Sequence, residues 1–209
     1  MRGDNVVAVS SGRWNDALLF SVTAVELGIL LILTPGLTLP DWIYVLQHVI
    51  VLVIALTRRS PAVTDHSFGV SAAVVVSYGY PYAQVIYLQR VPGVSLWAEG
   101  GTVLIMSGAL LSIVSLWTLG RRFGIRPALR GLTVRGTYRF VRHPMYLSYL
   151  LSDVGYCLQE CNLGTAALVM MGWVSMIYRI ESEERIMAQH PDWPAYTHVV
   201  RYRLLPGIW

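Results

Sequence analysis

Six apolar stretches recur along the 209-residue chain, and they constrain its fold more than any other feature. They cover residues 17–34, 42–57, 68–88, 102–119, 145–160 and 163–178. Only 13% of the chain is charged, 55% is hydrophobic, and the mean hydropathy is +0.52. Such a composition is too apolar for an ordinary soluble domain. A helix satisfies its own backbone hydrogen bonds in hydrocarbon, so these stretches are expected to cross a membrane as helices.

The sequence therefore predicts an all-α integral membrane protein with about five to six transmembrane helices. Several stretches are shorter than the roughly 20 residues of a perpendicular span, so the last two are expected to form a tight or partly re-entrant hairpin. We divide the chain into N-terminal transmembrane helices over residues 1–119, which provide a scaffold and lipid access, and a C-terminal region over 120–209. No signal-peptide pattern precedes the first stretch, and the start of the chain is expected to be retained.

The arginines predict the orientation. All sixteen basic residues are arginine, and with six spans and the N-terminus inside, only Arg90 falls outside. Cytoplasmic loops carry such an excess, so both termini and the C-terminal region are expected to face the cytoplasm. The loop arginines also suit anionic lipid headgroups. Nucleic acid is not an expected partner, because no nucleic-acid-binding signature accompanies them.

A few polar residues interrupt the apolar stretches. Glu26 and the Gln47-His48 pair are expected to face the bundle interior, because polar groups at membrane depth are costly; their role stays open. Cys157 and Cys161 lie four apart in one predicted helix, without a second cysteine pair or a histidine cluster. We interpret them as buried apolar residues and expect no metal site.

The segment Arg142-His143-Pro144-Met145-Tyr146 joins an arginine-rich loop to an apolar stretch. A helix that begins at a proline, directly behind an arginine and a histidine, offers free backbone amides and a positive dipole end to an anionic ligand. The segment is therefore a candidate site.

The next apolar stretch is followed by a second charged group. Helical spacing places Arg179 and Glu183 on one face and Glu181 with Arg185 on another, with Glu184 about 100° round from Glu183. Taken alone, this segment is also typical of a solvated helix face. Because both charged segments flank one helical hairpin, we expect Arg179, Glu183 and Glu184 to look toward His143.

The combined pattern is more specific than either half. It consists of the run from Gly136 to Tyr146, the pair Glu183-Glu184, Tyr196, and the run from Arg203 to Gly207. Over roughly residues 119–209, this pattern resembles the isoprenylcysteine carboxyl methyltransferase family and its bacterial relatives. The Arg-His-Pro-x-Tyr and paired-glutamate motifs are shared with the membrane phospholipid methyltransferases.

The resemblance implies a methyltransferase that depends on S-adenosylmethionine and acts on a lipophilic or prenylated acceptor. It also implies a cytoplasmic C-terminal cofactor-binding region. His143 and Tyr146 would line the cofactor pocket, and Glu183 and Glu184 would hold the polar parts of the cofactor. The catalytic candidates, Arg142 and Arg179, match arginines near the methyl acceptor. At one position, often glycine in the family, the chain has Ser148, whose small side chain still permits close helix packing.

Several functions remain open beside this one. Two arginines favour a carboxylate acceptor, because a guanidinium clamps it bidentately, whereas Glu183 with His143 would suit an amine, as in a phospholipid amine N-methyltransferase. A membrane reductase would place the extra phosphate of NADPH on Arg121, Arg122 and Arg126. A non-enzymatic lipid-binding protein is the third alternative. The sequence leaves the acceptor and the oligomeric state undetermined.

Overall fold

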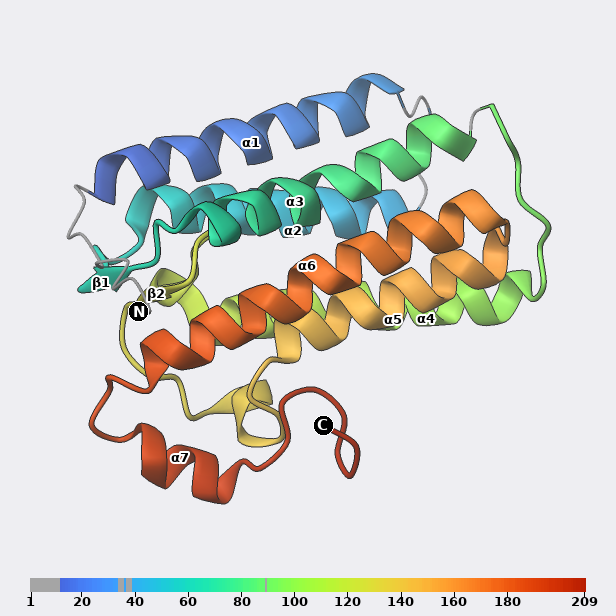
Figure 1. The fold of residues 1–209 in the computed structure, drawn as a ribbon. Helices are drawn as coiled ribbons and strands as arrows, with labels where there is room; N and C mark the ends of the chain where they lie inside the picture. Colours follow the sequence, from blue (N-terminus) through green and yellow to red (C-terminus); the bar gives the residue numbers. More distant parts are fainter. Residues whose placement is uncertain (1–11, 34–35, 37–38, 89) are drawn as a thin grey trace.

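The computed structural model describes residues 12–33, 36, 39–88 and 90–209, and almost all of its secondary structure is helical (Figure 1). Seven α-helices lie within these residues. They are α1 (Gly12–Leu33), α2 (Leu39–Thr57), α3 (Phe68–Leu88), α4 (Ala98–Leu119), α5 (Pro144–Gln159), α6 (Leu163–Met187) and the short α7 (Trp193–Val199). Each of the six apolar stretches of the sequence forms the body of one of the first six helices.

The first six helices run alternately up and down, so that consecutive helices are antiparallel (Figure 1). The main contacts are those of α4 with α5, α3 with α6, and α1 with α2. α5 and α6 follow each other in the chain but pack chiefly on different partners. The hairpin therefore ties two helix pairs into one bundle.

Small residues allow the closest of these contacts. A Cβ atom added at Gly101 of α4 would lie 2.6 Å from the carbonyl oxygen of Gly155 of α5, and one added at Gly108 would lie 2.6 Å from the carbonyl oxygen of Ser148. Helices in membranes approach closely at such positions. Ser148 is 1% exposed, and its hydroxyl donates to the carbonyl of Met145 at 2.6 Å. Serine at this position is thus compatible with tight packing, as expected from the sequence.

The loops at one end of the bundle are ordered by a two-stranded antiparallel sheet of β1 (Val63–Thr64) and β2 (Ala128–Leu129). This sheet joins the α2–α3 loop to the arginine-rich α4–α5 loop, and two 3-10 turns, η1 (Gly120–Arg122) and η2 (Gly136–Arg139), shape the rest of the latter loop. Gly120 ends α4 at a φ of 52°, a backbone conformation that favours glycine. α7 and the C-terminal segment lie below the same end of the bundle (Figure 1).

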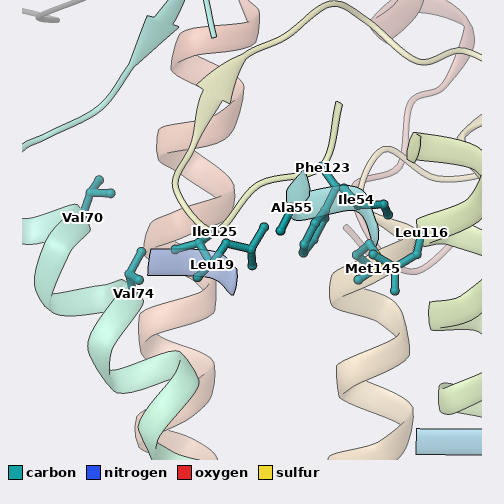
Figure 2. Packing of buried hydrophobic residues seen from close by; sticks show 9 residues of the cluster. All are labelled: Leu19, Ile54, Ala55, Val70, Val74, Leu116, Phe123, Ile125 and Met145. Carbon is teal, nitrogen blue, oxygen red and sulfur yellow. The ribbon is translucent and has the colours of Figure 1, made fainter. Parts of the chain in front are cut away.

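A buried apolar cluster connects this end to the helices (Figure 2). Its residues come from five helices and the α4–α5 loop: Leu19, Ile54, Ala55, Val70, Val74, Leu116, Phe123, Ile125 and Met145. Phe123 and Ile125 are 9% and 3% exposed although they belong to the loop. Burial of these two side chains fixes the arginine-rich segment against the bundle, since each contributes about 1.5–3 kcal/mol when fully buried.

Two helical segments within the described residues are long and apolar enough to cross a membrane, Ala98–Arg122 and Leu163–Met187. Leu19–Ile32 and Trp42–Thr57 are shorter apolar helices. The two-helix result supports a membrane protein, while the number of five to six spans stays a prediction. The prediction that the last helix is too short to span a membrane is wrong. α6 has 25 residues because it continues past Tyr178 through the charged segment.

The arginines that predict the orientation lie mostly at the end of the bundle that carries β1 and β2, whereas Arg90 follows α3 at the opposite end (Figure 1). Arg2 lies outside the described residues. Cys157 and Cys161 are free thiols of intermediate exposure, so their expected burial is only partial. They sit where α5 ends and the chain pairs with Val94 across an isolated bridge, at the end of the bundle that holds Arg90.

Candidate functional site

The start of α5 is held by the C-terminal segment. Pro144 begins the helix as the sequence predicts, with His143 as the N-cap residue. The backbone amides of Arg142 and His143 donate to the carbonyl oxygens of Tyr202 and Arg203, each at 2.9 Å. These two amides are therefore occupied by the protein itself.

Glu184 is the centre of a charged network between three segments. Its Oε1 lies 2.9 Å from Nε of Arg142 and 3.2 Å from Nε2 of His143. Its Oε2 accepts hydrogen bonds from Nε and Nη2 of Arg203, at 2.9 and 2.7 Å. The carboxylate thus links α6 to the start of α5 and to the tail. Its oxygens have several partners already, which suits a residue that positions the others.

Glu183 lies beside this network and borders a cavity. Its Oε1 accepts a hydrogen bond from the Tyr146 hydroxyl at 2.7 Å, and its Oε2 lies 3.7 Å from Nδ1 of His143. The rings of His143 and Tyr146 meet edge to face, with centroids 5.7 Å apart. The structure therefore brings together His143, Tyr146 and both glutamates.

Arg179 is buried at the base of the site, with 6% exposure. Its Nη1 donates to the Ser77 hydroxyl at 2.7 Å and its Nη2 to the carbonyl oxygen of Ile125 at 2.9 Å. The guanidinium also lies 5.5 Å from the ring centroids of both Tyr78 and Tyr146. Arg179 consequently connects α6 with α3 and the α4–α5 loop, and it places a positive charge among aromatic rings.

Five of the six predicted site residues, Arg142, His143, Tyr146, Arg179 and Glu183, line one cavity of about 910 Å³, counted to its open mouth, whereas Glu184 is not among its lining residues. Its polar walls include Arg142, His143, Arg179 and Glu183, and Tyr78, Tyr138, Tyr146, Tyr149, Trp193 and Tyr196 contribute aromatic surface. The α4–α5 loop covers it with Arg122, Arg126 and Arg130. Ligand sites typically combine apolar walls with a few placed polar groups. The cavity has the lining of a small-molecule site.

Two tyrosines outside the helical bundle have raised pKa values. The pKa of Tyr196 is raised to about 12, mainly by burial. The positive charge of Arg142 opposes this rise, and the negative charge of Glu184 adds to it. Burial also raises the pKa of Tyr138 well above its ordinary value. Both phenols are thus protonated at neutral pH. The Tyr196 hydroxyl donates to the carbonyl oxygen of Tyr138 at 2.9 Å, which fixes α7 against the loop.

A smaller cavity of about 360 Å³ adjoins the first between α1, α2 and α4. The two share the walls formed by Tyr78, Phe123, Met145 and Tyr149. Glu26 and His48 line the smaller cavity, with Oε2 of Glu26 3.5 Å from Nε2 of His48. Both therefore face the bundle interior, as the sequence predicts. In the described part of the chain, no group of three histidine, cysteine, aspartate or glutamate side chains is arranged to hold a metal ion.

Residues 101–189 match the model of the Isoprenylcysteine carboxyl methyltransferase (ICMT) family. Over this segment the chain is similar to the ICMT family. Protein-S-isoprenylcysteine O-methyltransferases A and B of Arabidopsis thaliana are each 30% identical to it over 95 residues, which are 43% of this chain and 48% of each relative. A probable protein-S-isoprenylcysteine O-methyltransferase of Oryza sativa subsp. japonica is 33% identical over 95 residues, or 43% of this chain and 50% of the relative. The chain spans about half the length of these curated relatives. No solved structure matches it.

The ICMT segment contains all six site residues predicted from the sequence. Arg203, which completes the Glu184 network, lies outside it. The sequence motif includes Arg203, but its contact with Glu184 could not be inferred, because two arginines, Arg201 and Arg203, follow α6. Ser77 and Ile125, the partners of Arg179, were also missed, since a serine in an apolar stretch and a backbone carbonyl carry no distinctive pattern.

A second missed polar group lies within the helix bundle. Asp153 of α5 is 8% exposed and accepts hydrogen bonds from the Tyr80 hydroxyl and from Nε1 of Trp173, each at 2.9 Å. It joins α3, α5 and α6. Because both partners donate to it, this carboxylate has a structural explanation in the helix packing.

Proposed function

We propose that the protein is an integral membrane methyltransferase that transfers a methyl group from S-adenosylmethionine to the carboxylate of a lipophilic acceptor, such as a prenylcysteine. The observation that carries the proposal is the placement of the ICMT motif residues around one cavity, at the end of an apolar helix bundle. The names of the plant relatives supply the acceptor class. A cavity at this depth is open to a water-soluble donor and near a lipid-soluble acceptor.

The residues present fit the proposed cofactor. S-adenosylmethionine carries a positive sulfonium, an amine, a carboxylate and an adenine, and the cavity offers Glu183, several arginines and aromatic rings to these groups. We assign His143, Tyr146 and Glu183 to cofactor binding, with Glu184 holding His143 and Arg142 in place. The cofactor, when bound, supplies an electrophilic methyl group.

For the reaction itself, the protein needs to orient and desolvate the acceptor. A carboxylate oxygen forms the new bond to the methyl carbon while the methyl–sulfur bond breaks, and the electron pair of that bond stays on sulfur. A carboxylate acceptor is already deprotonated, so no general base is required, and positioning supplies most of the rate enhancement. We propose Arg142 and Arg179 as the positive charges on the acceptor side, because both border the cavity.

Orientation completes the proposal. The bundle end that carries most arginines and the cavity is proposed to face the cytoplasm, where S-adenosylmethionine is available, in accord with the rule that cytoplasmic loops are enriched in positive charge. The acceptor would then reach the cavity from the cytoplasmic leaflet.

Binding of S-adenosylhomocysteine, the demethylated product, tests the proposal. Purified protein in nanodiscs is titrated calorimetrically, and we expect saturable binding that Glu183→Gln and His143→Ala abolish. Glu181→Gln is the matched control, because Glu181 is an exposed glutamate of the same helix. Absence of binding by the wild-type protein at hundreds of micromolar would refute the proposal.

One observation favours a second candidate, a reductase that uses NADPH. Arg122 and Arg126 line the cavity and would suit the extra phosphate of that cofactor. Competition distinguishes the two cases. We expect NADPH at a hundredfold excess to leave S-adenosylhomocysteine binding unchanged, whereas full displacement would favour the reductase.

A further inference from the structure

The α4–α5 loop brings an unusual excess of positive charge to the cavity. Residues 120–143 contain seven arginines and no acidic residue. Four of these arginines, Arg122, Arg126, Arg130 and Arg142, line the cavity, and Glu183 is its only acidic lining residue in the described part of the chain. A concave site with one sign of charge concentrates ligands of the opposite sign.

The two arginines that the ICMT motif supplies are already engaged by the protein. Arg142 pairs with Glu184, and Arg179 donates to Ser77 and to the carbonyl of Ile125. The charge of Arg142 is already paired with a carboxylate, and both Nη atoms of Arg179 already donate to the protein. Both arginines are therefore less suited to direct contact with an anion than their sequence positions indicate.

Arg122 and Arg126 are engaged less fully, with one hydrogen bond each within the described residues. Arg122 donates through Nη1 to the Thr133 hydroxyl at 3.2 Å, and its Nε is buried without a hydrogen-bond partner in the described residues. Arg126 donates through Nη1 to the Ser71 hydroxyl at 2.9 Å. Within the ranges that the structure describes, neither pairs with a carboxylate.

The charges around Arg122 favour the binding of an anion beside it. The charges that act on it are those of Arg59 and Arg135, and both are positive. Like charges near one another are unfavourable unless a counter-charge binds between them. The loop also holds the side chain in place, because β2 pairs with β1 and Phe123 is buried in the core.

We propose that Arg122 and Arg126 form a carboxylate-binding subsite of the cavity, which anchors the carboxylate of one of the two reactants. This assignment rests on the proposed function. Arg142 and Arg179 then act on the reactants through charge and through the side chains that they hold, while the loop arginines make the direct contact.

The test measures binding to the full chain in nanodiscs, with probes that differ only in the carboxylate. For the cofactor, S-adenosylhomocysteine is compared with its decarboxylated analogue. For the acceptor, N-acetyl-S-farnesylcysteine is compared with its carboxamide. Arg122→Gln is the main variant, Arg126→Gln is the second in case the first fails to fold, and Arg122→Lys retains the charge. Arg139→Gln is the matched control, since Arg139 is an exposed arginine of the same loop that does not line the cavity.

Loss of a charged hydrogen bond to a ligand weakens its binding by about tenfold or more. We expect Arg122→Gln to weaken binding of the carboxylic acid in one probe pair by about that factor and to leave binding of its carboxylate-free partner unchanged. Arg122→Lys should restore part of the lost affinity. The affected pair identifies which reactant carries the anchored carboxylate. If the wild-type protein binds the probes, but Arg122→Gln and Arg126→Gln bind all four probes with the same affinity as Arg139→Gln, the assignment of the carboxylate to Arg122 and Arg126 is overturned. The proposed function then stands. If wild-type protein binds none of them, both are overturned.

Discussion

The Glu184 network makes a quantitative prediction about the C-terminal segment. The Glu184 carboxylate is 13% exposed and contacts Arg142, His143 and Arg203 at 2.7–3.2 Å. Glu184→Gln keeps the size of the side chain but replaces one acceptor oxygen with an amide group that donates. At least one of the arginines then faces a donor instead of a carboxylate oxygen.

A hydrogen bond to a charged group is worth about 1.5–3 kcal/mol. Arg203 is 29% exposed, so solvent screens part of its interaction. We therefore expect the C-terminal segment to open more easily by about 2 kcal/mol, which is about thirtyfold in the opening equilibrium. The backbone hydrogen bonds from Arg142 and His143 to this segment remain, so the segment should not detach completely.

Hydrogen–deuterium exchange measures this opening directly. The reporter amides are those of Arg203 and Leu204, which donate to the carbonyl oxygen of Trp209 at 2.9 and 3.0 Å. Glu184→Gln should speed exchange of a peptide covering residues 200–209 by about thirtyfold, while α4 peptides stay unchanged. Glu181→Gln, on the exposed side of α6, is the control. Equal exchange in the two variants would refute the inference that Glu184 holds the tail.

Three further predictions concern other parts of the molecule. Arg179→Gln should abolish methyl transfer and also lower the thermal unfolding temperature, because two charged hydrogen bonds disappear, one from α6 to α3 and one from α6 to the α4–α5 loop. Wild-type turnover in this variant would remove Arg179 from the site. Burial favours a higher pKa for Asp65, but hydrogen bonds from Ser182 and Ser67 outweigh it and lower the pKa below its ordinary value. The ionised carboxylate therefore stabilises the fold at pH values above the unfolded pKa near 3.8, and this stabilisation is lost as the pH falls through the lower folded pKa. Asp65→Asn should flatten the acid limb of a melting-temperature profile, and an unchanged limb would contradict the contact. With Cys157 and Cys161 replaced by serine, an Arg139→Cys thiol should react with an impermeant maleimide only in inverted vesicles, and labelling of intact cells would reverse the proposed orientation.

Much of the helical framework follows from hydropathy, because apolar length is what a bilayer-spanning helix requires. The stretch 68–88 coincides with α3, and the stretch 145–160 differs from α5 by one residue at each end. The end of α6 was harder to predict. Its last turns, from Arg179 to Met187, are charged, and hydropathy alone does not distinguish a helix that continues into water from a loop.

The site was predictable only as a set of residues. Pro144 and the paired glutamates identify two segments, and the structure brings His143, Tyr146, Glu183 and Glu184 together. Their partners depend on packing between distant segments, which local patterns do not encode. Placing Arg122 against the cavity, for example, requires the β1–β2 pairing and the burial of Phe123, and neither is visible in a short run of sequence.

Transfer of a labelled methyl group tests the central claim most directly. Protein in nanodiscs is incubated with S-adenosylmethionine that carries tritium in its methyl group and with N-acetyl-S-farnesylcysteine, and the products are treated with mild base. The account predicts lipid-soluble label that base releases as volatile methanol, because a carboxyl methyl ester is base-labile, and it predicts no such label with Glu183→Gln. Label in a base-stable product would contradict the carboxylate acceptor, and no transfer together with no binding of S-adenosylhomocysteine would contradict the account as a whole.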